Sequence, residues 1–155
     1  IQKKLPRVMS LRDGKSKMRK SDESEYSRIN LQDTEDEIYK KIKKAKTDSE
    51  PIPSKIEDLK SRPEALNLIN IYSFITDKTL ENTLASMAGK DFSKLKKELS
   101  DALIATICPI GKKIKELKKD EKYLIEILKN GSNRAKEIAK ININKVKDIV
   151  GFISH

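Results

Sequence analysis

The stretch LKKELSDALIATICPIGKKIKEL, from Leu95 to Leu117, says most about the fold. Its apolar residues recur at steps of three and four positions, which is the spacing of one face of an α-helix. The residues on this face are Leu95, Leu99, Ala102, Leu103, Thr106, Ile107, Ile110, Ile114 and Leu117. Only Pro109 interrupts the pattern. Because proline lacks the N–H that an interior helical turn needs, we predict one long helix that is kinked there.

Three shorter helices are predicted before this stretch. The first begins at Asp33 or Thr34, either of which can cap it, and runs for about three turns into the lysine-rich residues 40–46. The second covers residues 63–76, and the third covers residues 80–87 before a glycine stop. Several prolines interrupt residues 47–62, so this segment is predicted to be a connector.

Two helices are predicted after the long one. A short helix ends before Asn130-Gly131, and a last helix begins near Ala135. Its apolar face consists of Ala135, Ile138, Ala139, Val146, Ile149 and Val150. These stripes predict a mainly α protein built as a helical bundle, with Tyr72, Phe74, Cys108 and Tyr123 in its core.

Residues 1–30 have a different character, because Pro6, Gly14 and several serines make them a loop region with a short β-prone stretch from Arg7 to Leu11. Within it lies Lys15-Ser16-Lys17-Met18-Arg19-Lys20-Ser21-Asp22. Two ammonium groups three positions apart, with a thioether between them and a hydroxyl after them, suit a loop that grips a polyphosphate. The alternative is a solvated basic segment without a partner.

The order of these residues resembles the Lys-Met-Ser-Lys-Ser signature loop of class I aminoacyl-tRNA synthetases. In that family the two lysines stabilise the pyrophosphate that leaves ATP during amino-acid activation. Lys17, Met18, Lys20 and Ser21 match the signature. Arg19 stands where the family has serine, so a charge is gained and a hydroxyl is lost.

Further segments resemble the bacterial tryptophanyl branch of this family more than the tyrosyl branch, which is the runner-up. They are Val8-Met9-Ser10-Leu11, Ser27-Arg28-Ile29-Asn30-Leu31, Lys41-Ile42-Lys43-Lys44-Ala45-Lys46-Thr47-Asp48, Arg62-Pro63-Glu64-Ala65-Leu66-Asn67-Leu68 and Val150-Gly151-Phe152-Ile153. The resemblance implies that residues 1–30 end a class I nucleotide-binding α/β domain. It also implies that residues 31–155 form a helical C-terminal domain of the anticodon-binding type.

The resemblance assigns the site as well. Lys17 and Lys20 would be catalytic, acting with Mg²⁺ on the departing pyrophosphate. The ATP-binding set would be Val8, through its backbone beside adenine, with Lys17, Met18, Arg19, Lys20 and Ser21. No protein metal site is expected, because the acidic clusters have no calcium-loop spacing and suit helix caps.

The family's first signature, His-Ile-Gly-His, is missing, since the only histidine is His155. The chain also opens on Ile1, close to the second signature. We therefore expect the C-terminal portion of a larger tryptophan–tRNA ligase, inactive by itself. The parent would bind ATP, tryptophan and tRNA and would be a homodimer. The amino-acid specificity follows from the resemblance alone.

The net charge of +10 favours a polyanionic partner, for which tRNA is the candidate. Candidate contacts are Lys112, Lys113, Lys115, Arg134 and Lys136. No run approaches the roughly 20 apolar residues of a membrane span, and one cysteine fits a reducing cytoplasm. Two other interpretations stay open: a non-catalytic RNA-binding helical module, and a protein-interaction bundle that binds no RNA.

Overall fold

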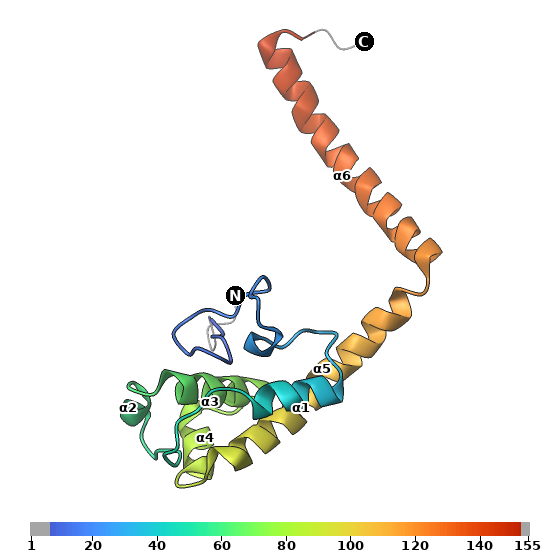
Figure 1. The fold of residues 1–155 in the computed structure, drawn as a ribbon. Helices are drawn as coiled ribbons and strands as arrows, with labels where there is room; N and C mark the ends of the chain where they lie inside the picture. The colour runs from blue at the N-terminus through green and yellow to red at the C-terminus, as the bar shows by residue number, and fades with distance from the viewer. Residues whose placement is uncertain (1–6, 153–155) are drawn as a thin grey trace. The chain divides into compact units, whose positions relative to one another are not determined.

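The computed structural model describes residues 7–152, in which six α-helices account for most of the chain (Figure 1). They are α1 (Glu35–Lys43), α2 (Ile56–Leu59), α3 (Pro63–Ile75), α4 (Leu80–Met87), α5 (Phe92–Leu117) and α6 (Glu121–Val150). A single 3-10 turn, η1 (Glu25–Ser27), precedes them. Within the described range no strand forms, which confirms the mainly α prediction. Pro6, Ile153 and His155, which figured in the sequence argument, lie outside that range.

The chain divides into two compact units, one up to Lys112 and the other from Lys113 onward. The first contains the N-terminal loop, α1 to α4 and most of α5. The second contains the end of α5 and all of α6. The boundary predicted at residues 30 and 31 follows the family's division into domains and stays a prediction.

Helix α1 begins with a capping box. The Thr34 hydroxyl accepts from the Glu37 N–H at 3.3 Å, and the Glu37 carboxylate accepts from the Thr34 N–H at 2.7 Å. This pairing gives hydrogen-bond partners to two backbone N–H groups, which have none within the helix because they lie at its start. Of the two caps predicted, Thr34 is therefore the one used. Asp33 has a separate role in the site described below.

The core of the first unit forms where α1, α3, α4 and α5 pack together (Figure 1). Fully or nearly fully buried side chains from these helices include Ile38, Ile42, Leu68, Ile69, Leu84, Met87, Leu95 and Leu99. Pro63 occupies the first turn of α3, and Gly89 follows α4 with a φ of 74°. Both features match the predicted start and stop.

Helix α5 buries Leu95, Leu99 and Leu103 of the predicted stripe, and also Cys108, which was predicted to lie in the core. The helix continues past Pro109, and the stripe residues Thr106 and Ile110 near it are exposed. Just beyond Pro109, Gly111 lies against the backbone of Leu31. A Cβ at this glycine would be 2.7 Å from the Leu31 carbonyl oxygen. The absence of a side chain is therefore what lets this part of α5 approach the chain before α1.

One predicted boundary is wrong, because the two helices predicted around Asn130-Gly131 are one helix, α6. An internal glycine costs a helix only about 1 kcal/mol, which a 30-residue helix can absorb when no tertiary contact demands a turn. Within the predicted connector at residues 47–62 a single-turn helix, α2, forms.

The predicted burial of α6 is also wrong, because none of its residues is buried. Tyr123 is 46% exposed, and Phe74 on α3 is 38% exposed. Tyr72, in contrast, is buried as predicted. No helix within residues 7–152 combines the length and the apolar character of a membrane span.

Candidate nucleotide-phosphate loop

Residues 8–18 fold back on themselves as a narrow loop. The Met18 N–H donates to the Val8 carbonyl at 3.1 Å, and the Ser10 N–H donates to the Ser16 carbonyl at 2.8 Å. These bonds flank an antiparallel bridge between Met9 and Lys17. The β-prone stretch predicted before the signature therefore pairs with the signature itself.

Asp13 shapes the turn of this loop. Its carboxylate accepts from the Lys15 N–H at 3.0 Å and from the Ser16 hydroxyl, as in an Asx turn. The Ser16 hydrogen bond is the main reason that the pKa of Asp13 is lowered. A carboxylate that is stabilised in this way keeps the turn closed while it is ionised.

Asn67 on α3 holds the first arm of the loop. Its side-chain oxygen accepts from the Met9 N–H at 3.0 Å, and its amide nitrogen donates to the Met9 carbonyl at 2.9 Å. This reciprocal pair gives Met9 the contacts that a neighbouring strand would give. Asn67 is 5% exposed, so both bonds are shielded from water.

The turn rests on the start of α3. A Cβ at buried Gly14 would lie 2.4 Å from the Pro63 carbonyl carbon, so only glycine fits there. Next to it, Lys46 and Glu64 form an ion pair of 2.9 Å. Lys46 is the main cause of the lowered pKa of Glu64, and a backbone hydrogen bond from Gly14 also contributes.

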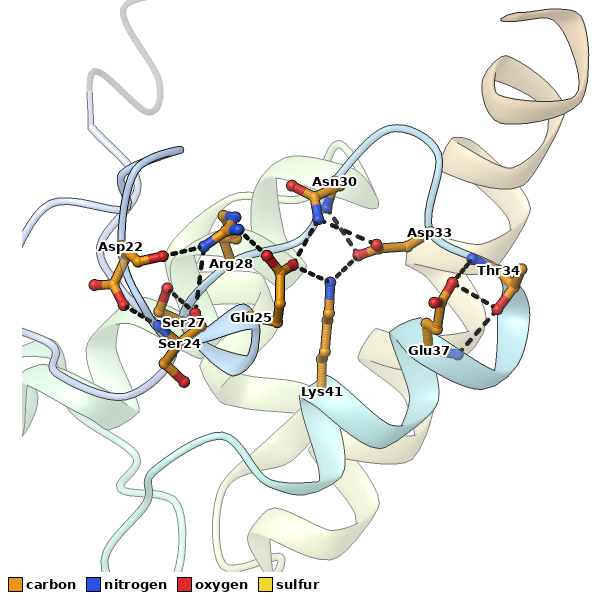
Figure 2. A network of polar contacts seen from close by, with 10 residues as sticks. All are labelled: Asp22, Ser24, Glu25, Ser27, Arg28, Asn30, Asp33, Thr34, Glu37 and Lys41. Atoms are coloured by element: carbon orange, nitrogen blue, oxygen red, sulfur yellow. Dashed lines mark hydrogen bonds and ion pairs between the residues drawn. The ribbon is translucent and has the colours of Figure 1, made fainter. Parts of the chain in front are cut away.

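Arg28 fixes the chain where it leaves the signature (Figure 2). Its Nη1 donates to the carbonyl of Asp22 at 2.8 Å and to that of Ser24 at 3.3 Å. Its Nη2 forms an ion pair with Glu25. Since Asp22 follows Ser21 directly, the guanidinium holds the backbone at the C-terminal end of the signature segment.

A buried ion pair links this end to α1. The Lys41 ammonium lies 2.6 Å from a carboxylate oxygen of Asp33, and both side chains are 7% exposed. The Asp33 carboxylate also accepts from the Asn30 N–H at 2.8 Å, and Glu25 lies 3.9 Å from Lys41 (Figure 2). Polar contacts therefore run without a break from Asp22, directly after the signature, to Lys41 in the last turn of α1.

The signature segment, residues 17–21, presents cations that the described chain leaves unpaired. Lys17, Arg19 and Lys20 are exposed, and their charged groups make no hydrogen bond or ion pair with any residue from 7 to 152. Met18 is partly buried against the core. A thioether anchored between two free ammonium groups is an arrangement suited to holding a polyphosphate.

The structure thus brings the predicted site residues together on one loop. Val8 pairs with Met18, and Ser21 adjoins the segment held by Arg28. Sequence reasoning gave no role to Asn67 or Lys41. Both residues lie in segments that resemble the family, but nothing in the sequence pattern indicated what their side chains contact. The predicted tRNA contacts at residues 112, 113, 115, 134 and 136 are exposed, and Lys113 pairs with Glu116 at 2.9 Å.

Comparison with known proteins places this loop in a family. Residues 2–107 match the family described as tRNA synthetases class I (W and Y). The chain is 47% identical to a protein named tryptophan–tRNA ligase in Agrobacterium fabrum, over 96% of its own length and 42% of that relative. A protein of the same name in Caulobacter vibrioides is 47% identical over 94% of the chain and 42% of its own length.

Two solved structures share the fold. Tryptophanyl-tRNA synthetase from Mycoplasma pneumoniae superposes with a TM-score of 0.78 at 25% identity, covering 99% of this chain and 47% of the other. The Campylobacter jejuni protein gives a TM-score of 0.68 at 22% identity, over 95% of this chain and 44% of its own. This chain therefore spans less than half the length of the proteins that it matches.

Proposed function

The chain belongs to the class I tRNA synthetases of the W and Y type, and from this premise we propose that it supplies the ATP-phosphate loop and the helical tRNA-binding part of a tryptophan–tRNA ligase. The observation that carries the proposal is the loop itself. The segments on either side of the signature are held by buried or charged contacts, while the ammonium groups of Lys17 and Lys20 have no partner in the described chain.

In the proposed reaction the tryptophan carboxylate attacks the α-phosphorus of ATP, the bond to the bridging oxygen breaks, and pyrophosphate leaves. Negative charge then grows on the leaving group. The ammonium groups of Lys17 and Lys20 would stabilise that charge, and Arg19 would add a third cation beside them. The aminoacyl group next passes to the terminal adenosine of tRNA, and AMP is released.

Each remaining loop residue has a positioning role in this proposal. Met18 would keep the two lysines on the solvent side because its own side chain packs on the core. Val8 would lie beside adenine through its backbone, and Ser21 would offer a hydroxyl to a phosphate oxygen. Mg²⁺ would neutralise phosphate charge, held mainly by ATP oxygens and water, as is usual for this ion at nucleotide sites.

We also propose which parts of the chain serve which function. Residues 1–30 would complete the nucleotide-binding domain, and residues 31–155 would form the helical tRNA-binding domain, with residues 47–62 connecting helices α1 and α3. Lys112, Lys113, Lys115, Arg134 and Lys136 are the proposed phosphate contacts. The cytoplasmic location and the homodimeric parent stay predictions.

The decisive experiment is ATP–pyrophosphate exchange with tryptophan, measured on the complete product of the gene that encodes this chain. We expect Lys17→Ala and Lys20→Ala each to reduce kcat by about 100-fold or more, as removal of one transition-state donor does elsewhere. Lys15→Ala is the matched control, because Lys15 lies on the same loop outside the signature. It should keep nearly full activity.

Four results would overturn parts of the proposal. Equal losses of activity in all three variants would mean that the lysines act only through the total positive charge of the loop. Unchanged exchange in both signature variants would remove the catalytic assignment. Exchange with tyrosine in place of tryptophan would favour the tyrosyl type, and a complete gene product without any exchange would favour a non-catalytic RNA-binding module.

A further inference from the structure

A hollow between α1 and α5 lies outside the signature loop. Its lining residues are Tyr39, Lys43, Thr47, Phe92, Ser93, Lys96, Lys97 and Ser100. Three of these are lysines, four carry hydroxyl groups, and none is acidic. A surface that gathers cations and hydroxyl donors without a carboxylate is complementary to an anion.

Lys96 forms the fixed wall of this hollow. Its ammonium donates to the Ala45 carbonyl at 2.7 Å and lies 3.4 Å from the Lys43 carbonyl. These carbonyls belong to the end of α1, so Lys96 compensates the negative end of that helix. An ammonium group has three donors, which leaves one for a ligand. Burial lowers the pKa of Lys96, as expected for a cation without an anionic partner.

Lys43 and Lys97 provide the mobile charges. Both are exposed, and their ammonium groups have no hydrogen-bond or ion-pair partner among residues 7–152. Ser93 lies in the first turn of α5, where backbone N–H groups and the helix dipole add positive potential. The hollow therefore combines one half-buried lysine and two lysines without partners with a helix start.

Tyr39 gives the hollow a flat apolar surface beside these charges. The residue is 48% exposed although it belongs to a helix that buries Ile38 and Ile42 completely. Exposed aromatic rings next to lysines are the usual platform for unpaired bases, because stacking needs no particular base and the lysines hold the backbone. An inorganic anion has no planar base that could stack on the ring.

We propose that the hollow between α1 and α5 binds a backbone phosphate of single-stranded RNA, with the adjoining unpaired base stacked on Tyr39. The phosphate lies among Lys43, Lys96 and Lys97, and the Ser93 hydroxyl donates to it. This inference rests on the proposed function, in which a tRNA is the RNA partner. It adds a contact surface that the predicted tRNA lysines do not include.

The test measures binding of a fluorescently labelled tRNA transcript with a tryptophan anticodon to the 155-residue chain across a series of salt concentrations. Lys43→Gln/Lys97→Gln removes two charges from the hollow. Lys55→Gln/Lys60→Gln removes two exposed charges near α2 and is the matched control. We expect the hollow variant to weaken Kd by about tenfold or more and to reduce the salt slope by about 1 to 2, while the control changes Kd less than about threefold.

Tyr39 is tested separately. Tyr39→Ala should weaken binding by about five- to 100-fold, the range that loss of one stacked base produces, whereas Tyr39→Phe keeps the ring and should bind like the unaltered chain. Equal effects of the two variants would overturn the stacking step. Circular dichroism of each variant establishes that the chain keeps its helix content.

Two further outcomes overturn the inference. The first is equal weakening by the hollow and control pairs, which would mean unspecific attraction. The second is RNA binding unaffected by the hollow pair while inorganic phosphate still shifts the NMR signals of Lys43 and Lys97, which would make this a site for free anions. Pyrophosphate exchange reports on Lys17 and Lys20 independently, so failure here leaves the signature-loop assignment standing, and the reverse also holds.

Discussion

Helices α5 and α6 have similar lengths and similar apolar periodicity, yet they differ completely in burial. Among the 26 residues of α5, seven are buried, including Leu95 and Leu99, which have no exposed surface. Among the 30 residues of α6, none is buried. An amphipathic pattern therefore identifies a helix and its apolar face, but the surface that covers this face is set by other parts of the chain.

The partners of α5 come from segments far away in the sequence. The Tyr72 hydroxyl lies 2.9 Å from the Glu98 carboxylate, Lys96 caps the end of α1, and Gly111 touches the Leu31 backbone. Helix α6 is defined by local features instead. The Asp120 carboxylate accepts from the Tyr123 N–H at 3.0 Å at its start, and Gly151 ends it with a φ of 74°.

The largest contrast is expected from truncating one apolar residue in each helix. Leu99→Ala should lower the free energy of unfolding by about 2–5 kcal/mol, because it leaves a cavity in a closed core. Ile138→Ala, at a residue that is 67% exposed, should change it by less than about 0.5 kcal/mol in the same chain. Urea unfolding followed by the fluorescence of the tyrosines measures both.

This contrast can fail in an informative way. A loss above 1 kcal/mol for Ile138→Ala would mean that the apolar face of α6 is covered in solution. The difference in burial between α5 and α6 would then not hold. Repeating the measurement over a range of protein concentrations separates association between chains from packing within one chain, because only association depends on concentration.

The next contrast uses the two glycines inside these helices. A Cβ at Gly111 would collide with the Leu31 carbonyl oxygen, whereas a Cβ at Gly131 would meet no atom within 4 Å. Gly111→Ala should therefore destabilise the chain by about 1–2 kcal/mol, since the strain exceeds the gain in helix propensity. Gly131→Ala should stabilise α6 by about 0.5–1 kcal/mol.

Amide hydrogen exchange reads out the glycine pair residue by residue. Slower exchange confined to α6 is expected for Gly131→Ala, and faster exchange around Leu31 and the end of α5 is expected for Gly111→Ala. If both substitutions stabilised the chain, the close approach of Gly111 to the Leu31 backbone would have no effect on the free energy of unfolding.

Local chemistry explains which parts of the fold were predictable. A cap at Asp33 or Thr34, the proline in the first turn of α3 and the glycine after α4 each act within a few residues, so the sequence alone indicated them. The structure added the choice of Thr34 and its reciprocal bond with Glu37. The sequence predicted a break at Asn130-Gly131 because this dipeptide is typical of turns. Helix α6 continues through it, since no contact near Gly131 requires the chain to turn there.

The candidate site divides in the same way. Lys17, Met18 and Lys20 could be proposed from the sequence because their order resembles the family signature, and their role stays a prediction. Asn67 was not, because it acts on Met9, a residue 58 positions away, and a single amide in an apolar stripe has no characteristic pattern. The Asp33–Lys41 pair was hidden for a related reason, since Asp33 also fits a helix cap.

The smallest predicted effect concerns the response of the first unit to acid. Arg62 forms an ion pair with Asp48 and hydrogen bonds with two nearby carbonyls, and its hydrogen bond to Asp48 holds the pKa of that carboxyl below 3.8. A carboxyl with a lowered folded-state pKa adds stability above its unfolded pKa and loses it as the pH falls through the folded value.

Asp48→Asn should therefore remove a stabilising contribution of less than about 1 kcal/mol near neutral pH, since a partly exposed pair is screened by solvent. Below the folded-state pKa of Asp48 the variant and the unaltered chain should have converged. Melting curves recorded through the near-ultraviolet signal of the four tyrosines test this, because three of them, including buried Tyr72, lie in the unit that contains the pair. A constant difference between the two chains at every pH would show that the asparagine acts through packing, and the ionisation of Asp48 would then have no part in the stability of the first unit.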